Sequence, residues 1–258
     1  MATKYPIILA HGIFMKPRLF RVFRYIQHGL SAAGYRVYVA DTDGVGNTES
    51  NALMLSKQID EILEKEKAEK INIIAHSKGG LESVHMIEHL DMGKKIASLT
   101  TICTPFRGSA VASFVNGLPG FLLSTFVFFT NAFYKILGDK NPDFRTAVKQ
   151  LDLRDEYDKE NVLASHGIYC QSYSSRMHKA TSDPVLSISY LISTHHERDV
   201  SDGMVSNKST RFAEYKGDCI EDSVSHNEIV CYLTRRSKKE KVLRFYISLC
   251  EELSQMGF

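Results

Sequence analysis

A serine in residues 72–80, NIIAHSKGG, lies between a stretch suited to a buried strand and a segment suited to a helix. Small residues lie two positions before it and two positions after it, at Ala75 and Gly79. A serine at a sharp strand-to-helix turn is held in a strained backbone conformation, and small neighbours let such a turn close. The pattern A-x-S-x-G departs from the stricter G-x-S-x-G and also fits an ordinary turn. It predicts a nucleophile at Ser77 only if the chain supplies catalytic partners.

Apolar runs alternate with helical spacings along the chain, which implies parallel β-α units and an α/β fold. The 258 residues, 43% of them hydrophobic, suffice for one large domain over residues 1–258. In the longest predicted helix, Leu53, Ile59 and Ile62 are expected to point inward. Strands are predicted at residues 7–10, 35–40, 71–75, 96–103 and 167–173, and helices at residues 17–33, 50–70, 81–90, 184–193 and 238–255.

Residues 108–134 contain no charged side chain and six of the fourteen phenylalanines of the chain. A membrane span needs about 20 consecutive apolar residues, whereas Gly117, Pro119 and Gly120 leave only the stretch from residue 121 to residue 134. The sequence therefore predicts no transmembrane span. Two interpretations remain: a pair of short buried helices, or a helical cap over about residues 106–150 that covers an apolar pocket and meets a lipid surface. We favour the cap.

Charge and cysteine usage exclude several classes of protein. The net charge of +2 is too small to imply a nucleic-acid partner, and five scattered cysteines without a C-x-x-C motif indicate neither a disulfide framework nor a zinc cluster. His195, His196 and Asp199 lack the further ligands of a transition-metal site. The first residues, MATKYPIILAHG, show no signal-peptide pattern, as expected of a cytoplasmic protein or of a secreted protein in its mature form.

A serine nucleophile needs a histidine to take its proton and a carboxylate to orient that histidine. In α/β architectures these groups follow the order Ser, Asp or Glu, His. His226 is the one histidine beyond His196, so it is the predicted base. Among the preceding aspartates, Asp202 is favoured because Asp-Gly-Met-Val suits a turn at a strand end, with Asp199 as the alternative.

Acyl transfer also needs donors for the developing oxyanion. The N–H group of Lys78 follows the serine at a predicted helix N-terminus, where the helix dipole favours negative charge. The N–H group of Ile13, in the loop after the first strand, is the second predicted donor, and Gly12 permits close approach of the backbone. His11 is expected to brace this loop. The side chain of Lys78 is expected to face the pocket entrance.

The chain resembles the bacterial triacylglycerol lipases of the α/β-hydrolase superfamily, particularly the Pseudomonas–Burkholderia–Proteus group. The matching segments are YPIILAHGI, INIIAHSKGG, TICTPFRGS, DGMV and SHNE, in this order. The resemblance implies an α/β-hydrolase fold, with a mostly parallel central sheet flanked by helices and a helical cap or lid. It also implies a catalytic triad of Ser77, Asp202 and His226, with oxyanion donors at Ile13 and Lys78. Catalysis in this family needs no cofactor.

The same resemblance implies a structural calcium ion near the histidine loop. Its carboxylate ligands would correspond to Asp183 and Glu228 here. Two carboxylates with loop carbonyls suit a hard cation. The lipase pattern has aspartate where Glu228 stands, and the longer side chain would change the geometry. The alternative is a pair of surface acids without a metal.

The sequence therefore predicts a serine hydrolase that cleaves carboxylic esters with apolar acyl chains, a triacylglycerol lipase or carboxylesterase acting at a lipid–water interface. A thioesterase or an acyltransferase with the same triad is the alternative among enzymes. A non-catalytic lipid-binding protein on the same scaffold is the alternative from another class, although it would not need an intact triad. No feature of the sequence sets an oligomeric state.

Overall fold

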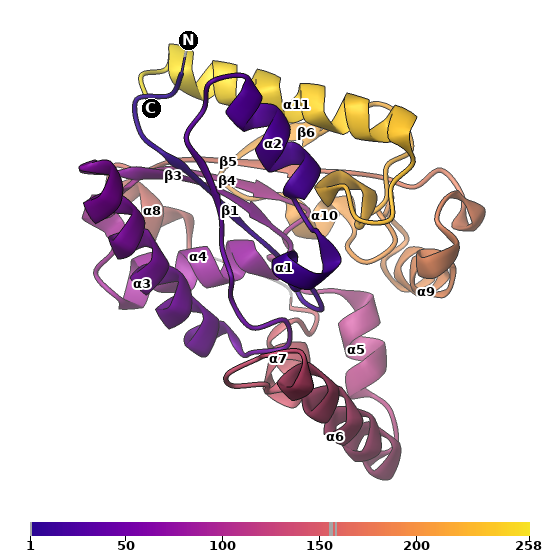
Figure 1. Ribbon diagram of the computed structural model, residues 1–258. Coiled ribbons are helices and arrows are strands. Elements are labelled where there is room, and N and C mark those ends of the chain that lie inside the picture. The colour runs from indigo at the N-terminus through magenta and orange to yellow at the C-terminus, as the bar shows by residue number, and fades with distance from the viewer. Residues whose placement is uncertain (1, 155–156, 158) are drawn as a thin grey trace.

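A six-stranded parallel sheet forms the centre of the molecule (Figure 1). The structure is a computed structural model that describes residues 2–154, 157 and 159–258. The strand order is β2-β1-β3-β4-β5-β6, and all five pairings are parallel, so the predicted parallel sheet is confirmed. The strands are β1 (Ile7–Ala10), β2 (Val37–Val39), β3 (Ile71–His76), β4 (Ile96–Ile102), β5 (Tyr169–Ser174) and β6 (Glu214–Asp218).

Helices connect the strands, and a further helix follows the last strand of the sheet. The α-helices are α1 (Pro17–Phe20), α2 (Arg24–Ala32), α3 (Thr48–Glu66), α4 (Lys78–His89), α5 (Ala110–Asn116), α6 (Gly120–Ile136), α7 (Phe144–Gln150), α8 (Glu160–Ser165), α9 (Ser187–Glu197), α10 (Asn207–Thr210) and α11 (Arg236–Gln255). Short 3-10 turns cover Gly93–Lys95, Ala180–Ser182, Pro184–Leu186 and Glu228–Val230.

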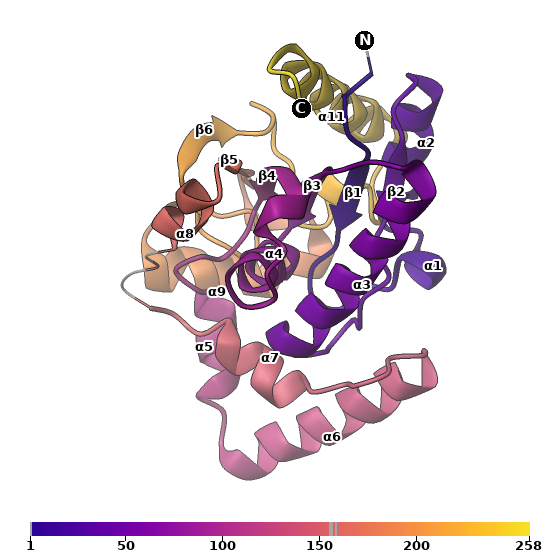
Figure 2. The same ribbon diagram turned by 90° about the vertical axis from the view of Figure 1, so that its left-hand side faces the viewer.

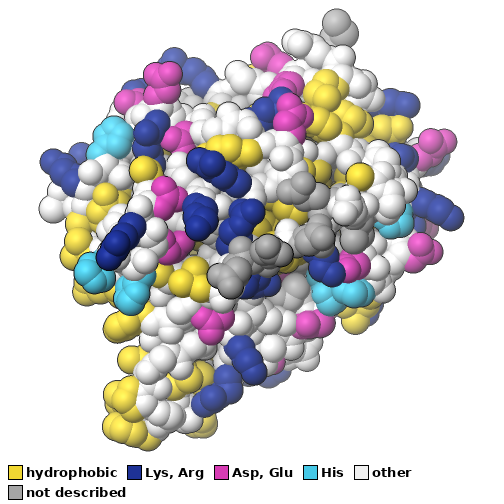
Figure 3. Space-filling model, turned by 180° about the vertical axis from the view of Figure 1, so that it is seen from behind, with side chains coloured by type: hydrophobic (Ala, Val, Ile, Leu, Met, Phe, Trp, Pro, Cys, Tyr) yellow, Lys and Arg dark blue, Asp and Glu magenta, His cyan; other side chains and the backbone are white. Residues whose placement is uncertain are grey.

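The phenylalanine-rich segment folds into α5 and α6, which are bent by 111° relative to each other. In the described residues no single helix is long and apolar enough to cross a membrane, and this bent pair meets the criterion only jointly. Helix α6 lies at the opposite end of the molecule from α11 (Figure 2). Its only buried residues are Leu123 and Tyr134, so the interpretation as a pair of buried helices is wrong for α6. Apolar side chains gather on this protruding end (Figure 3).

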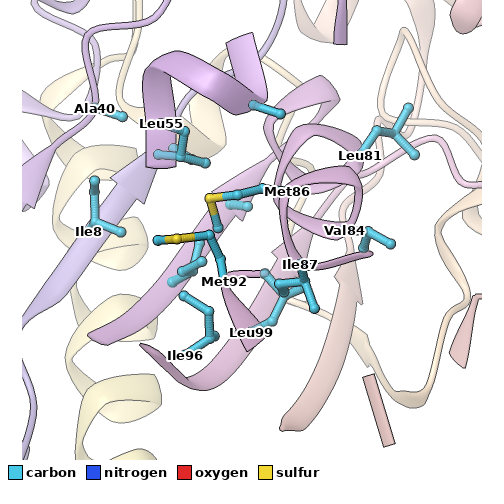
Figure 4. Packing of buried hydrophobic residues seen from close by; sticks show 14 of the residues in the cluster. Ile8, Ala40, Leu55, Leu81, Val84, Met86, Ile87, Met92, Ile96 and Leu99 are labelled. Carbon is cyan, nitrogen blue, oxygen red and sulfur yellow. The ribbon is translucent and has the colours of Figure 1, made fainter. Parts of the chain in front are cut away.

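Two hydrophobic clusters hold the helices against the sheet. Helices α2 and α11 cover one face, where they pack on Ile7 and Leu9. Helices α3, α4 and α8 cover the other face, where Ile8 is buried (Figure 4). Alternate residues of β1 therefore point to opposite faces, and both faces are buried, which explains why this strand is apolar at every position.

The helix predicted over residues 17–33 is two helices. Arg21 and Phe23 have φ angles of 55° and 62°, which interrupt α-helical geometry. Phe23 is fully buried, and its N–H group donates to the Val230 carbonyl oxygen at 3.1 Å. Tertiary packing therefore overrides a local spacing that suits one continuous helix.

Helix α3 begins and ends earlier than predicted, and one of its predicted core residues is wrong. The side chain of Asn47 accepts the Ser50 N–H at 2.8 Å and caps the helix start. Leu55 and Ile59 lie on the buried face, whereas Leu53 is 47% exposed. Two residues along a helix correspond to about 200° of rotation, which places Leu53 away from Leu55.

Strand β6 and helices α7, α8 and α10 were not apparent in the sequence pattern. Strand β6 reads EYKGD and lies at the edge of the sheet, so it has no apolar run. The two ends of the chain meet beyond the sheet, where the Lys4 N–H donates to the Phe258 carbonyl oxygen at 2.7 Å. Both ends lie far from α6 (Figure 1).

Candidate active site

Ser77 lies at the sharp turn between β3 and α4. Its φ and ψ angles are 55° and −131°, a conformation that is costly for a residue with a side chain. Its N–H group donates to the Ile102 carbonyl oxygen at 2.9 Å, and its carbonyl oxygen accepts the Gly80 N–H at 3.0 Å. These two hydrogen bonds hold the strained turn between the sheet and the first turn of the helix.

Crowding around this turn explains the small residues in the motif. A Cβ atom at Gly79 would lie 2.7 Å from the His11 carbonyl oxygen, and one at Gly12 would lie 2.6 Å from Ser77 Cβ. Ala75 is buried in β3 and pairs in register with Ala10 of β1. Alanine therefore fits where the stricter motif has glycine, whereas positions 12 and 79 need glycine.

His226 and Asp202 meet in a buried hydrogen bond at the carboxyl end of the sheet. The His226 Nδ1 and Asp202 Oδ2 atoms are 2.7 Å apart, and the His226 backbone N–H donates to the Asp202 carbonyl oxygen at 2.9 Å. The other oxygen of this carboxylate accepts the N–H groups of Met204 and Val205, at 2.9 and 2.8 Å. The Asp202 carboxylate is thus fixed by three donors, and Nε2 is the ring nitrogen of His226 that does not contact it.

The alternative acid, Asp199, lies elsewhere. Its carboxylate accepts the Lys208 N–H at 2.6 Å. In the described chain, the one group of metal-ligating side chains whose donor atoms come together is Cys103, Asp202 and His226. A hydrogen bond joins His226 to Asp202, and the Cys103 thiol interacts with the same carboxylate.

Cys103 is a neighbour of the pair that was not predicted from the sequence. It follows β4 directly, and its Sγ atom is 3.2 Å from the Ser175 hydroxyl. Burial raises the pKa of the Cys103 thiol well above its usual value, and the Asp202 charge adds to this effect. The thiol therefore stays protonated beside the carboxylate and is no thiolate nucleophile. Its place after a strand end is the sequence signal that could have located it.

Two further histidines support the site without taking part in the pair. The ring of His76 packs against the ring of His226 with centroids 4.4 Å apart. Burial, followed by the nearby His226 imidazole, holds the pKa of His76 well below its usual value. His76 therefore stays neutral and places no second positive charge beside an imidazolium at His226. His11 donates from Nδ1 to the Gly12 carbonyl oxygen at 2.9 Å, as expected of a residue that braces this loop.

The two predicted oxyanion donors belong to segments that adjoin Ser77. Lys78 is the first residue of α4, and Ile13 follows Gly12 in the loop after β1. Neither backbone N–H donates to a protein acceptor within the part of the chain that the structure describes. Ile13 also lines the same cavity as Ser77. The helix start adds a partial positive charge at Lys78.

The side chain of Lys78 does not face the pocket entrance, so this prediction is wrong. It is buried and forms an ion pair with Glu82 one turn later in α4. The Glu82 Oε1 atom also accepts from Asn51 Nδ2 at 2.8 Å, and Asn51 in turn donates to the Asp43 carbonyl oxygen at 2.8 Å. The residue after Ser77 is therefore anchored to α3 and to the loop before it. The i,i+4 spacing of Lys78 and Glu82 was the sequence signal for this contact.

Ser77 and His226 both line an apolar cavity of about 150 Å³. Much of its wall comes from the predicted cap segment: Val111, Ala112 and Val115 of α5, Phe126 of α6, and Phe144 and Val148 of α7. Ser77 and His226 therefore line a surface that suits hydrocarbon rather than a charged ligand.

The two predicted calcium ligands lie close together but already have protein partners. Asp183 Oδ2 accepts from the Ser225 hydroxyl at 2.6 Å, and Glu228 Oε2 accepts the Ser225 N–H at 3.0 Å. The Lys238 ammonium group pairs with the same Glu228 oxygen at 2.6 Å. A cation at this place would have to displace an ammonium group, so these residues do not fit a calcium site.

Comparison with known proteins identifies a family profile and related lipases. The sequence profile of the alpha/beta hydrolase fold matches residues 5–137. Triacylglycerol lipases of Pseudarthrobacter phenanthrenivorans and Burkholderia plantarii are each 36% identical over 121 residues. The matched part is 45% of this chain but only 37% and 33% of those two lipases, about a third of their length.

A solved structure extends the similarity over the whole fold. The mature lipase BlEst2 of Bacillus licheniformis superposes with a TM-score of 0.66 and 20% sequence identity. The superposition covers 96% of this chain and 92% of that lipase. At this identity the likeness concerns the fold, which includes the segments after residue 137 that the sequence profile does not reach.

Proposed function

Because this chain belongs to the alpha/beta hydrolase fold family, we propose that it is a serine hydrolase that cleaves carboxylic esters with apolar acyl chains, in the manner of a triacylglycerol lipase or carboxylesterase. The observation that carries the proposal is one shared cavity. Ser77 and His226 line it together, and His226 is hydrogen-bonded to Asp202 behind it. A nucleophile, a base and an orienting carboxylate in this relation are the requirements of acyl transfer.

The proposed reaction runs in two acyl-transfer steps. The Ser77 hydroxyl oxygen attacks the ester carbonyl carbon while His226 Nε2 takes its proton. The tetrahedral intermediate then expels the alcohol, which receives that proton from His226, and an acyl-enzyme remains. Water, deprotonated by His226, attacks the acyl-enzyme carbonyl carbon, and His226 returns this proton to the Ser77 oxygen as the bond to the acyl group breaks and the acid leaves. Asp202 keeps the proton of His226 on Nδ1 and stabilises the imidazolium, so no cofactor is needed.

The N–H groups of Ile13 and Lys78 are proposed to stabilise the oxyanion of each tetrahedral intermediate. Loss of a single such donor lowers kcat by about 10²- to 10³-fold in a comparable enzyme. Both groups belong to the backbone, so side-chain substitution does not remove them. Their positions depend instead on Gly12 and on the Lys78–Glu82 anchor.

Helices α5 to α7 are proposed to act as a lid over the acyl-binding cavity. They supply apolar wall residues to the cavity and stand apart from the sheet. A lid of this kind would cover the acyl chain during reaction and expose its apolar face to a lipid–water interface. This is the reason to expect lipid esters rather than small polar esters as substrates.

A scan of p-nitrophenyl esters tests the acyl preference. The wild type is expected to hydrolyse the octanoate with a higher kcat/KM than the acetate. Ala112→Phe narrows the cavity and is expected to lower kcat/KM for the octanoate by about tenfold or more. The reason is that each methylene group that no longer fits an apolar pocket costs roughly 1–3 kcal/mol of transition-state binding. The same change at Ala132, on the exposed surface of α6, is the matched control. A marked preference of the wild type for acetate would contradict the proposal.

A thioesterase and an acyltransferase share the acyl-enzyme step. A thioesterase differs in its leaving group, which is a thiol, and an acyltransferase differs in its acceptor, which is not water. Product analysis with an added alcohol separates transfer from hydrolysis, and acyl thioesters of equal chain length test the leaving group. A non-catalytic lipid-binding protein would show no turnover of any ester. The buried Asp202–His226 pair has no evident use in such a protein, which favours the enzyme.

Lys238 is proposed to supply the positive charge beside Glu228 that calcium would otherwise provide. Chelation with EDTA is then expected to leave the melting temperature unchanged. Lys238→Met should lower the melting temperature, since each kcal/mol of lost unfolding free energy corresponds to about 2–4 °C in a domain of this size. The control is Lys241→Met, which removes an ion pair with Asp222 in which both side chains are more than half exposed. A rise of several degrees on adding calcium to the wild type, reversed by EDTA, would refute this assignment.

A further inference from the structure

Helix α6 carries most of its apolar side chains on the outside of the molecule. Phe128, Phe129 and Ile136 are 67%, 65% and 83% exposed, and Phe121 and Phe133 are also more than half exposed. A helix that is apolar all round is normally found in a protein core or in a membrane. A contiguous apolar surface of this kind is expected to be covered by a binding partner. Figure 3 shows that apolar side chains gather at this end of the molecule.

A basic cleft lies beside the segment that follows α6. One of its lining residues is Lys140, four residues after the last residue of that helix. The cleft has a volume of about 900 Å³ and lies between helices α1 and α2 on one side and α3 on the other. Five basic and two acidic side chains line it, a net charge of +3, whereas the whole chain carries only +2. The basic residues are Arg18, Arg21, Arg24, Lys57 and Lys140, and the acidic residues are Asp41 and Glu61.

Most of this positive charge is not neutralised by the protein. Arg18 forms an ion pair with Asp41 at 3.0 Å. The other four basic side chains of the cleft have no ion-pair partner within the described residues. Unpaired cations around a cleft indicate an anionic ligand, and phosphate groups are a common class.

The cleft and α6 are held together by buried hydrogen bonds. The Asp43 carboxylate accepts the N–H groups of Lys140 and Asn141, at 2.8 and 2.6 Å. The buried Asp139 carboxylate pairs with Lys16 at 2.8 Å and accepts the Gly44 N–H at 3.0 Å. The segment that leaves α6 is therefore fixed to the loop beside the cleft, so the basic cleft adjoins the C-terminal end of the apolar helix.

We propose that helix α6 and the adjoining basic cleft dock the protein on an anionic phospholipid surface. Helix α6 inserts its phenylalanines among the acyl chains, and the basic cleft receives phosphate-bearing headgroups beside it. The occupant is inferred from the combination of surfaces. Apolar side chains surround α6 instead of forming a single stripe, which suits a fluid hydrocarbon layer better than a groove on a protein. The positive charge of the adjoining cleft suits anionic headgroups. The proposal deepens the proposed function, on which it rests, because the inserted helix also lines the active-site cavity through Phe126.

Flotation with vesicles tests the docking apart from hydrolysis. Ser77→Ala protein is mixed with vesicles of phosphatidylcholine alone or of equal parts phosphatidylcholine and phosphatidylglycerol. We expect at least tenfold tighter binding to the anionic vesicles, and a smaller preference at high salt. Arg21→Gln/Arg24→Gln should weaken anionic binding by about 25-fold, since each basic residue near such a surface contributes a factor of about five. Phe128→Ser/Phe129→Ser should weaken binding to both kinds of vesicle.

The matched control makes the same charge change at the other end of the molecule. Arg235→Gln/Arg236→Gln alters the exposed start of α11, which lies far from α6. This variant is expected to bind both kinds of vesicle as tightly as the parent, which is the Ser77→Ala protein without further changes. Equal binding of the parent to neutral and anionic vesicles, or equal losses in the two arginine variants, would overturn the proposal. So would calorimetric binding of inorganic phosphate without any vesicle preference, which would assign the cleft to a soluble anion.

Failure of the docking and failure of the proposed function are separable. Hydrolysis of a soluble p-nitrophenyl ester by the wild type reports on the catalytic site alone. If the wild type hydrolyses no such ester while the Ser77→Ala protein floats with anionic vesicles, the proposed function fails and the docking stands. The opposite pair of results leaves an ester hydrolase that does not use α6 and the basic cleft for lipid.

Discussion

Ser77→Ala is expected to lower kcat for ester hydrolysis by roughly 10⁴- to 10⁶-fold, because the remaining residues cannot form an acyl-enzyme. His226→Ala should have a similar effect, and the double variant should lose no more than either single variant. The reason is that nucleophile and base act in one step, so removing the second adds nothing once the first is gone. Asp202→Asn should lower kcat by about 10⁴-fold, since it disturbs the tautomer of His226.

Initial rates on a soluble ester, with active-site titration by a fluorophosphonate, measure this series. The wild type should gain one covalent adduct on Ser77, and Ser77→Ala should gain none. Ser31→Ala, on the exposed surface of α2, controls for expression and handling. The assignment of the nucleophile would be refuted by Ser77→Ala retaining wild-type turnover, or by an adduct that maps to another serine.

The buried Lys78–Glu82 ion pair is the second place where a single change should have a large effect. Glu82→Gln leaves the Lys78 ammonium uncompensated in the interior, and removal of one partner of a buried pair typically costs about 3–5 kcal/mol. In a domain of this size the melting temperature should then fall by roughly 6–20 °C. Lys78→Met should destabilise for the converse reason. The double variant Lys78→Met/Glu82→Gln should recover much of the loss, because no unpaired charge remains.

Thermal unfolding of all four proteins completes a double-mutant cycle. The exposed pair of Lys95 and Asp60 provides the control, and its removal should change stability by less than about 1 kcal/mol. If the losses in the two single variants simply add in the double variant, the two side chains are not coupled and the anchor is incorrect. The folded double variant should also keep some ester hydrolysis, since the proposed oxyanion donor at Lys78 is its backbone N–H.

The sequence predicted those parts of the site whose chemistry is tied to chain order or to local crowding. Gly12 and Gly79 lie where a Cβ atom would collide with neighbouring atoms, and a motif records such local crowding directly. His226 followed from being the last histidine in the chain. The role of Asp202 depended on turn residues, which also left Asp199 open. The triad assignment itself stays a prediction until the variants are measured.

Features that depend on distant contacts were missed or predicted wrongly. The Lys78 side chain was expected at the pocket entrance, but the ion pair with Glu82 and the hydrogen bond from Asn51 to Glu82 stabilise it in a buried position. Phe23 breaks a helix because its backbone bonds to Val230, some two hundred residues later in the chain. Strand β6 has no hydrophobic pattern since it lies at the sheet edge. In each case the deciding partner is remote in sequence, so no local pattern records it.

The adjacency of the two chain ends has a practical consequence. The Lys4–Phe258 hydrogen bond brings them together on the side of the molecule away from α6. A tag or carrier attached at either end would leave the apolar helix α6 facing outward. Tethering through a terminal tag would therefore orient immobilised molecules uniformly on a sensor chip. For the same reason, a short linker could join the two ends without disturbing α6.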